Sequence, residues 1–110
     1  MKLTFIELPP FQRYRTEFLD DEAYRLFQNE LLENPEKGDL IQGLGGLRKV
    51  RISDNNRNKG KRGGARVIYY YVVNRDQIFL ITAYGKHKQT DLTTEQRKAL
   101  LSLIETIKTL

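Results

Sequence analysis

The segment KGKRGGARVIYYYV, residues 59–72, combines four cations with an aromatic, strand-like run. From Arg48 to Arg66 the chain carries eight Lys or Arg residues and a single acid, Asp54. Such clustering of positive charge on a folded domain usually indicates a polyanionic partner, above all nucleic acid. A solvated basic loop without a ligand is the alternative. The charge pattern therefore favours a nucleic-acid partner.

Basic side chains of this kind could bind phosphates, or they could help cleave RNA without a metal. In that reaction the 2′-hydroxyl of RNA attacks the adjacent phosphate, and the protein supplies a base, an acid and charge stabilisation. Arg51 and Arg66 suit charge stabilisation, because a guanidinium stays charged and bonds two phosphate oxygens. Neighbouring arginines would lower the pKa of Lys49 or Lys86, which makes either lysine a candidate for proton transfer.

Two further side chains are candidates for the same chemistry. His87 is the only group that titrates near neutral pH without perturbation, although an exposed loop histidine is an equal interpretation. Tyr84, expected at a strand end, could stack on a base. The other predicted RNA-binding residues are Arg48, Lys59, Lys61, Arg62 and Lys88.

Other types of site are not expected. One histidine and no cysteine disfavour a transition-metal centre, so neither a metal nor another cofactor is predicted. The glycines of GLGG, residues 43–46, are not followed by Gly-Lys-Ser/Thr and more simply provide turns. No Ser-His-Asp arrangement or carboxylate pair stands out.

The hydrophobic periodicity predicts the elements that must position the basic residues. The pattern predicts a strand ended by Pro9-Pro10, a short helical turn, and a helix with Asp20 as N-cap that stops after Asn34. Thr93 and Gln96 form a predicted capping box for the last helix. The expected strands cover residues 2–8, 47–52, 66–73 and 77–84.

The expected fold class is α+β, in one domain spanning residues 1–110. About four strands, in the order β-α-α-β-β-β-α, would form a small antiparallel sheet with the helices packed on one face. Residues 54–65 would form a basic flexible loop. In such a meander Arg51, Arg66 and Lys86 would meet at one edge of the sheet.

The composition also bears on location. The chain lacks cysteine, a signal-peptide pattern and any run of about 20 apolar residues that would span a bilayer. We therefore expect a cytoplasmic protein with no membrane partner.

Three stretches together resemble one known group of proteins. They are GGLRKVRI at 45–52, NKGKRGGARVIYYY at 58–71 and FLITAYGK at 79–86. This ordered combination is similar to the HigB branch of the RelE/ParE toxin superfamily. The similarity runs over essentially the whole chain, including YRLFQNELLENPEKGD at 24–39 and LTTEQRKAL at 92–100.

The resemblance implies a RelE-like fold and a toxin of a type II toxin–antitoxin system. RelE and HigB members are mRNA interferases: ribosome-dependent endoribonucleases that cut mRNA in the ribosomal A site through the 2′-hydroxyl route and so inhibit translation. The implied partner is a cognate antitoxin of the HigA type with a helix-turn-helix domain. Operator DNA would then be bound only through the toxin–antitoxin complex.

The resemblance assigns the family's basic positions to Lys49, Arg51, Arg66 and Lys86. RelE has an arginine at the position of His87 and a functional tyrosine near Thr93, and neither is matched here. The general base and acid therefore stay open. Two alternative functions also stay open: a ParE-like inhibitor of DNA gyrase on the same fold, and a non-catalytic RNA-binding module.

Overall fold

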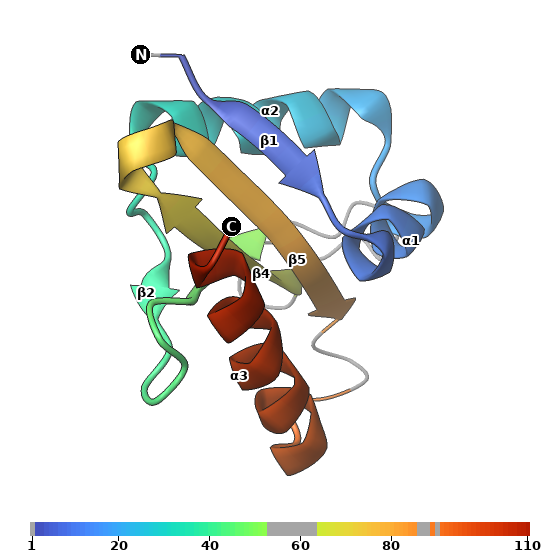
Figure 1. Ribbon diagram of the computed structural model, residues 1–110. Helices are drawn as coiled ribbons and strands as arrows, with labels where there is room; N and C mark the ends of the chain where they lie inside the picture. Colours follow the sequence, from blue (N-terminus) through green and yellow to red (C-terminus); the bar gives the residue numbers. More distant parts are fainter. Residues whose placement is uncertain (1, 53–63, 86–88, 90) are drawn as a thin grey trace.

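Three α-helices, five strands and one 3-10 turn occur in the part of the chain that the computed structural model describes, which is residues 2–52, 64–85, 89 and 91–110 (Figure 1). In chain order they are β1 Thr4–Glu7, α1 Pro9–Phe18, α2 Asp21–Glu33, β2 Asp39–Leu40, β3 Arg48–Ile52, β4 Ala65–Val72, η2 Val73–Arg75, β5 Gln77–Gly85 and α3 Thr94–Lys108. This arrangement confirms the predicted α+β class.

The strands form one sheet in the order β1-β5-β4-β3-β2. The three long strands β3, β4 and β5 form the predicted antiparallel meander. The prediction of an antiparallel sheet of about four strands was wrong in one respect, because β1 pairs parallel to β5. A fifth strand, β2, pairs antiparallel with β3. No hairpin joins β1 to β5, so local pattern does not fix their relative direction. β2 has two residues, too few for a period-two signal.

Helices cover both faces of the sheet, so the prediction that they pack on one face was also wrong. The cluster around α1 and α2 contains Phe11, Phe27 and Leu31, which pack with the sheet residues Val67 and Tyr69. The cluster around α3 contains Leu100, Ile104 and Ile107, together with Ile68, Phe79 and Ile81 of the sheet. Consecutive residues of β4 and β5 are apolar on both sides, and each side requires its own cover.

Local signals explain where the helices begin. Asp20 caps α2, as predicted, and its side chain accepts a 2.7 Å hydrogen bond from the Ala23 amide. The predicted capping box of Thr93 and Gln96 is present at the start of α3. Pro9-Pro10 was expected only to end the first strand. The pair also begins α1, a full ten-residue helix rather than a short turn, because proline is favoured in the first helical turn.

Three consecutive tyrosines of β4 divide between the two faces, as strand geometry requires. Tyr69 and Tyr71 pack towards α2, whereas Tyr70 packs on the side of α3. Fully buried Tyr69 donates a hydrogen bond to the Pro35 carbonyl (2.8 Å) and accepts one from the Gly38 amide (2.9 Å). This core residue therefore ties the segment after α2 to the central strand. Within the described ranges, no helix has the length and apolar character needed to cross a membrane.

Candidate nucleic-acid interface

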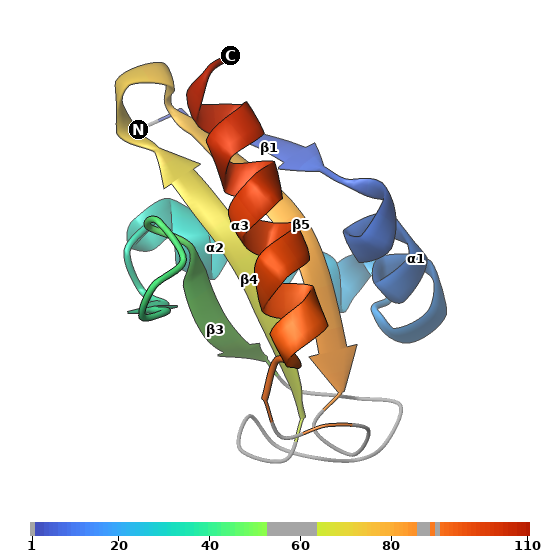
Figure 2. The same ribbon diagram turned by 60° about the horizontal axis from the view of Figure 1, so that its bottom comes forward.

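A row of side chains that the sequence predicted to be functional crosses three strands at one end of the sheet. Arg51 of β3 lies opposite Arg66 of β4, and Arg66 lies opposite Tyr84 of β5. Lys49 precedes Arg51 by two residues and lies opposite Ile68, so it shares the face covered by α3. Figure 2 shows the beginning of α3 over this end of the sheet, where β3 and β5 end and β4 begins. We use the name basic row for four residues, namely Lys49, Arg51, Arg66 and the neighbouring Tyr84.

Arg66 is the unusual member of the basic row because it is buried. It has a relative exposure of 4%, and its Nη1 donates to the Ala65 carbonyl at 3.3 Å. Burial lowers the pKa of Arg66, and the neighbouring Arg51 guanidinium lowers it further. Arg51 itself is exposed. Two adjacent guanidiniums, one of them desolvated, form a place where an anion would be strongly stabilised.

Tyr84 lies in the core beneath α3 rather than at the surface. Its relative exposure is 8%, and it belongs to the same apolar cluster as Leu100 and Ile104. The prediction that a base stacks on its ring does not fit this position, because stacking needs an open ring face. Burial raises the pKa of Tyr84, the Asp91 carboxylate raises it further, and Arg66 lowers it. The protonation of the Tyr84 hydroxyl is therefore coupled to the charges of Arg66 and Asp91.

Asp91 is a member of the site that the sequence analysis missed. Its Oδ1 lies 3.7 Å from Nζ of Lys49, and the carboxylate is 65% exposed. The residue follows β5 and precedes the N-cap of α3, and it is separated from Lys49 by 42 positions in the chain. The available signal was its position as the lone acid between Asp76 and Glu95, next to predicted cations. Asp91 therefore offers a counter-charge to Lys49.

Arg48 lies on the opposite face of β3 from Lys49. Its Nη1 donates to the carbonyls of Gly38 (2.7 Å) and Glu36 (3.2 Å), and its Nη2 lies 3.2 Å from the Glu36 carboxylate. Its side chain is only 17% exposed. The structure thus separates Arg48 from the basic row and gives it contacts that hold the segment before β2.

Several predicted residues lie outside the described part of the chain: Lys59, Lys61, Arg62, Lys86, His87 and Lys88. Gly85, which precedes Lys86, pairs with Ala65 beside the basic row. Ala65 begins β4, so the segment predicted as a loop at 54–65 ends earlier than expected. The predicted meeting of Arg51 with Arg66 is confirmed by the register, and the place of Lys86 stays a prediction.

Replacing Asp91 by asparagine should raise the affinity of the chain for a phosphate-containing ligand by about two- to fivefold, the range expected for one exposed charge pair. The substitution removes the negative charge beside Lys49 and keeps the shape of the side chain. The measurement is titration with a short RNA carrying 2′-O-methyl groups, which cannot undergo attack by the 2′-oxygen. Glu95→Gln, an equal change of charge in the first turn of α3, is the matched control. Equal affinities of Asp91→Asn and the native chain would contradict the assignment.

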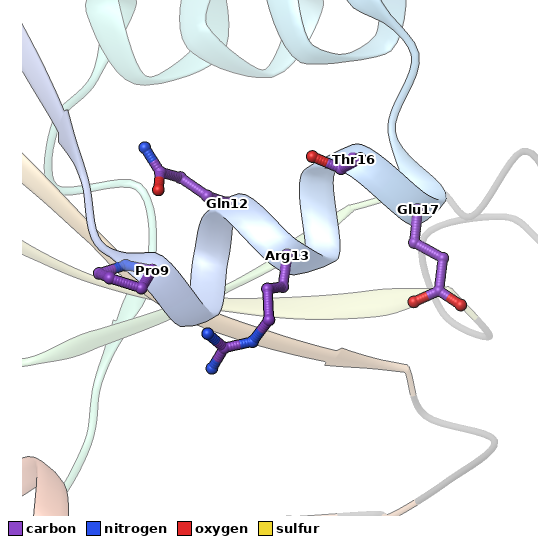
Figure 3. A pocket seen from close by; sticks show the side chains of 5 residues that line it. All are labelled: Pro9, Gln12, Arg13, Thr16 and Glu17. Atoms are coloured by element: carbon purple, nitrogen blue, oxygen red, sulfur yellow. The ribbon is translucent and has the colours of Figure 1, made fainter.

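Two hollows of the described surface are less suited to a polyanion than the basic row. The hollow in Figure 3 is lined by residues of α1 alone, namely Pro9, Gln12, Arg13, Thr16 and Glu17. A second hollow, of about 270 Å³, has a mainly apolar lining contributed by Pro10, the end of β5 including Tyr84, Leu92 and α3. Neither brings cations from different strands together, and the basic row does.

No protein-family model matches the sequence of the chain. Several solved structures, however, are similar to its fold. Isolated RelE toxin from E. coli has a TM-score of 0.57 at 12% identity, with 93% of this chain and 99% of that chain covered. The RelBE toxin–antitoxin complex of E. coli gives 0.54 at 16%, covering 76% and 96%. A conserved hypothetical protein, HP0892 from Helicobacter pylori, gives 0.54 at 14%, covering 79% and 98%. The chain therefore has the fold of the RelE toxin.

Proposed function

We propose that this protein is a toxin of a type II toxin–antitoxin system that cleaves mRNA on the ribosome and thereby inhibits translation. The observation that carries the proposal is the pairing of Arg51 with buried Arg66 on a RelE-like fold. Burial and the neighbouring Arg51 guanidinium both lower the pKa of Arg66, so a bound anion would stabilise the charged form of this pair. A phosphodiester is such an anion, because a guanidinium can form a bidentate pair of hydrogen bonds with two phosphate oxygens.

In the proposed reaction the 2′-oxygen of a nucleotide attacks the adjacent phosphorus, and the bond from phosphorus to the 5′-oxygen breaks. Negative charge on the phosphoryl oxygens rises as the phosphorane forms. Arg51 and Arg66 would stabilise that charge, and Lys49 would add to the field once Asp91 is displaced by the RNA. Lys49, Lys86 and His87 stay the proposed candidates for proton transfer.

The proposed partners follow from the same comparison. RelE is present with its antitoxin in the RelBE complex, and we propose an equivalent antitoxin for this chain. Its assignment to the HigA type, with binding of operator DNA through the complex, and the HigB-type subclass rest on the sequence resemblance. Lys59, Lys61, Arg62 and Lys88 remain proposed contacts to mRNA or ribosomal RNA.

The test is induction of the chain in bacterial cells, followed by mapping of mRNA 5′ ends. We expect new ends in phase with codons for the native chain, and their loss in Arg51→Ala. Arg51 is exposed, so the substitution should leave the fold intact. Arg25→Ala is the matched control, because Arg25 is an exposed arginine on α2, which packs on the opposite face of the sheet.

Three results would contradict the proposal, each in its own way. Arrested DNA replication with intact mRNA would instead support a gyrase inhibitor. RNA binding without cleavage or growth arrest would support a non-catalytic binding module. Cleavage that survives Arg51→Ala but not Arg25→Ala would place the active site elsewhere on the chain.

A further inference from the structure

The hydroxyl of Tyr84 is a buried polar group without a hydrogen-bond partner among the described residues. Its ring is well packed, at 8% exposure, in the cluster beneath α3. A phenylalanine would fill the same space without placing a polar atom in the core. A buried hydroxyl that lacks a partner lowers stability, so its presence calls for a ligand or another role.

The other core tyrosines with hydroxyl contacts show the contrast. Tyr69 has two partners for its hydroxyl, the Pro35 carbonyl and the Gly38 amide. Tyr24 donates a 2.7 Å hydrogen bond to the Glu7 carboxylate. These two hydroxyls hold the fold together. Among the described residues, the Tyr84 hydroxyl makes no such contact. Tyr84 lies directly opposite Arg66 on the neighbouring strand.

We propose that Tyr84 is a phosphate ligand whose hydroxyl donates a hydrogen bond to a phosphoryl oxygen bound by Arg66 and Arg51. The three residues form one row across β5, β4 and β3, on the same face of the sheet. The arginines supply charge and the tyrosine supplies a neutral donor. The inference extends the proposed function, since the RNA form of this ligand rests on it.

The environment of Tyr84 suits a donor rather than a base. Burial and the nearby Asp91 carboxylate raise the pKa of Tyr84, so the phenol keeps its proton at neutral pH. A neutral donor also adds no positive charge to a pair of guanidiniums that already repel each other. In the proposed reaction the phenol stabilises the phosphorane and keeps its own proton throughout.

The experiment compares Tyr84→Phe with Tyr69→Phe, two substitutions that each remove one hydroxyl from a buried tyrosine of the same sheet. Binding of inorganic phosphate and of a 2′-O-methyl RNA is measured by titration, and Tm is measured without ligand. We expect Tyr84→Phe to weaken both ligands by roughly 10- to 100-fold, as for a hydrogen bond to a charged group, with Tm unchanged or raised. Tyr69→Phe should lower Tm and leave both affinities unchanged.

The outcomes separate this inference from the proposed function. If the native chain binds phosphate, Tyr84→Phe weakens that binding and no RNA is cleaved, the nuclease proposal fails and the ligand role of Tyr84 stands. If RNA is cleaved but Tyr84→Phe binds both ligands within twofold of the native chain, the inference is overturned by itself. A fall in Tm for Tyr84→Phe as large as that of Tyr69→Phe would also overturn it, as would the absence of phosphate binding by the native chain.

Discussion

Arg66→Met is expected to lower the rate of RNA cleavage by about 10²- to 10³-fold, the usual cost of losing one group that stabilises transition-state charge. Methionine keeps an unbranched stem in the buried position and removes the guanidinium. Because burial and Arg51 both disfavour the charged form of Arg66, the free energy of unfolding should stay constant or rise. The measurements are single-turnover cleavage of mRNA on ribosomes and denaturant unfolding without RNA.

Two control variants make this result specific. Arg66→Lys keeps the positive charge but loses the bidentate hydrogen bonding of the guanidinium. Its cleavage rate should therefore lie between those of the native chain and Arg66→Met. Arg25→Met removes an exposed arginine on the far side of the sheet and should change neither quantity. If Arg66→Met lost about 2 kcal/mol or more of stability, Arg66 would have a structural role and the phosphate assignment would fail.

Ile104→Ala is expected to destabilise the protein by about 2–5 kcal/mol, the range for truncating a fully buried aliphatic side chain. Ile104 is fully buried between α3 and the sheet. The prediction depends on α3 covering its own face of the sheet. If helices covered only the opposite face, Ile104 would contribute little to stability. Denaturant unfolding of the native and variant chains gives the difference directly.

Two further truncations give the reference points for that measurement. Leu101 lies on the same helix as Ile104, but its side chain is 42% exposed. Leu101→Ala should therefore lower the free energy of unfolding much less than Ile104→Ala does. Leu31→Ala removes a fully buried side chain on the face covered by α2 and should cost as much as Ile104→Ala. A loss for Ile104→Ala no larger than that of Leu101→Ala would contradict the two-faced core.

Short-range chemistry made much of the fold predictable. The helix start at Asp20, the capping box at Thr93 and the long strands of the meander each depend on residues within a few positions of one another. The register that places Arg51 opposite Arg66 was also within reach, because antiparallel neighbours adjoin at fixed ends. For the same reason, the cationic part of the candidate site was visible in the sequence.

The remaining features depend on long-range packing. The parallel pairing of β1 with β5 joins segments more than seventy positions apart, and no local preference encodes its direction. The approach of Asp91 to Lys49 and the opposite placement of Arg48 follow from where α3 and the segment before β2 pack. By itself the sequence determined which side chains could bind a phosphate. Only the tertiary structure decided which were buried, which were paired and which hydroxyl had no partner among the described residues. Burial and pairing are properties of several segments together.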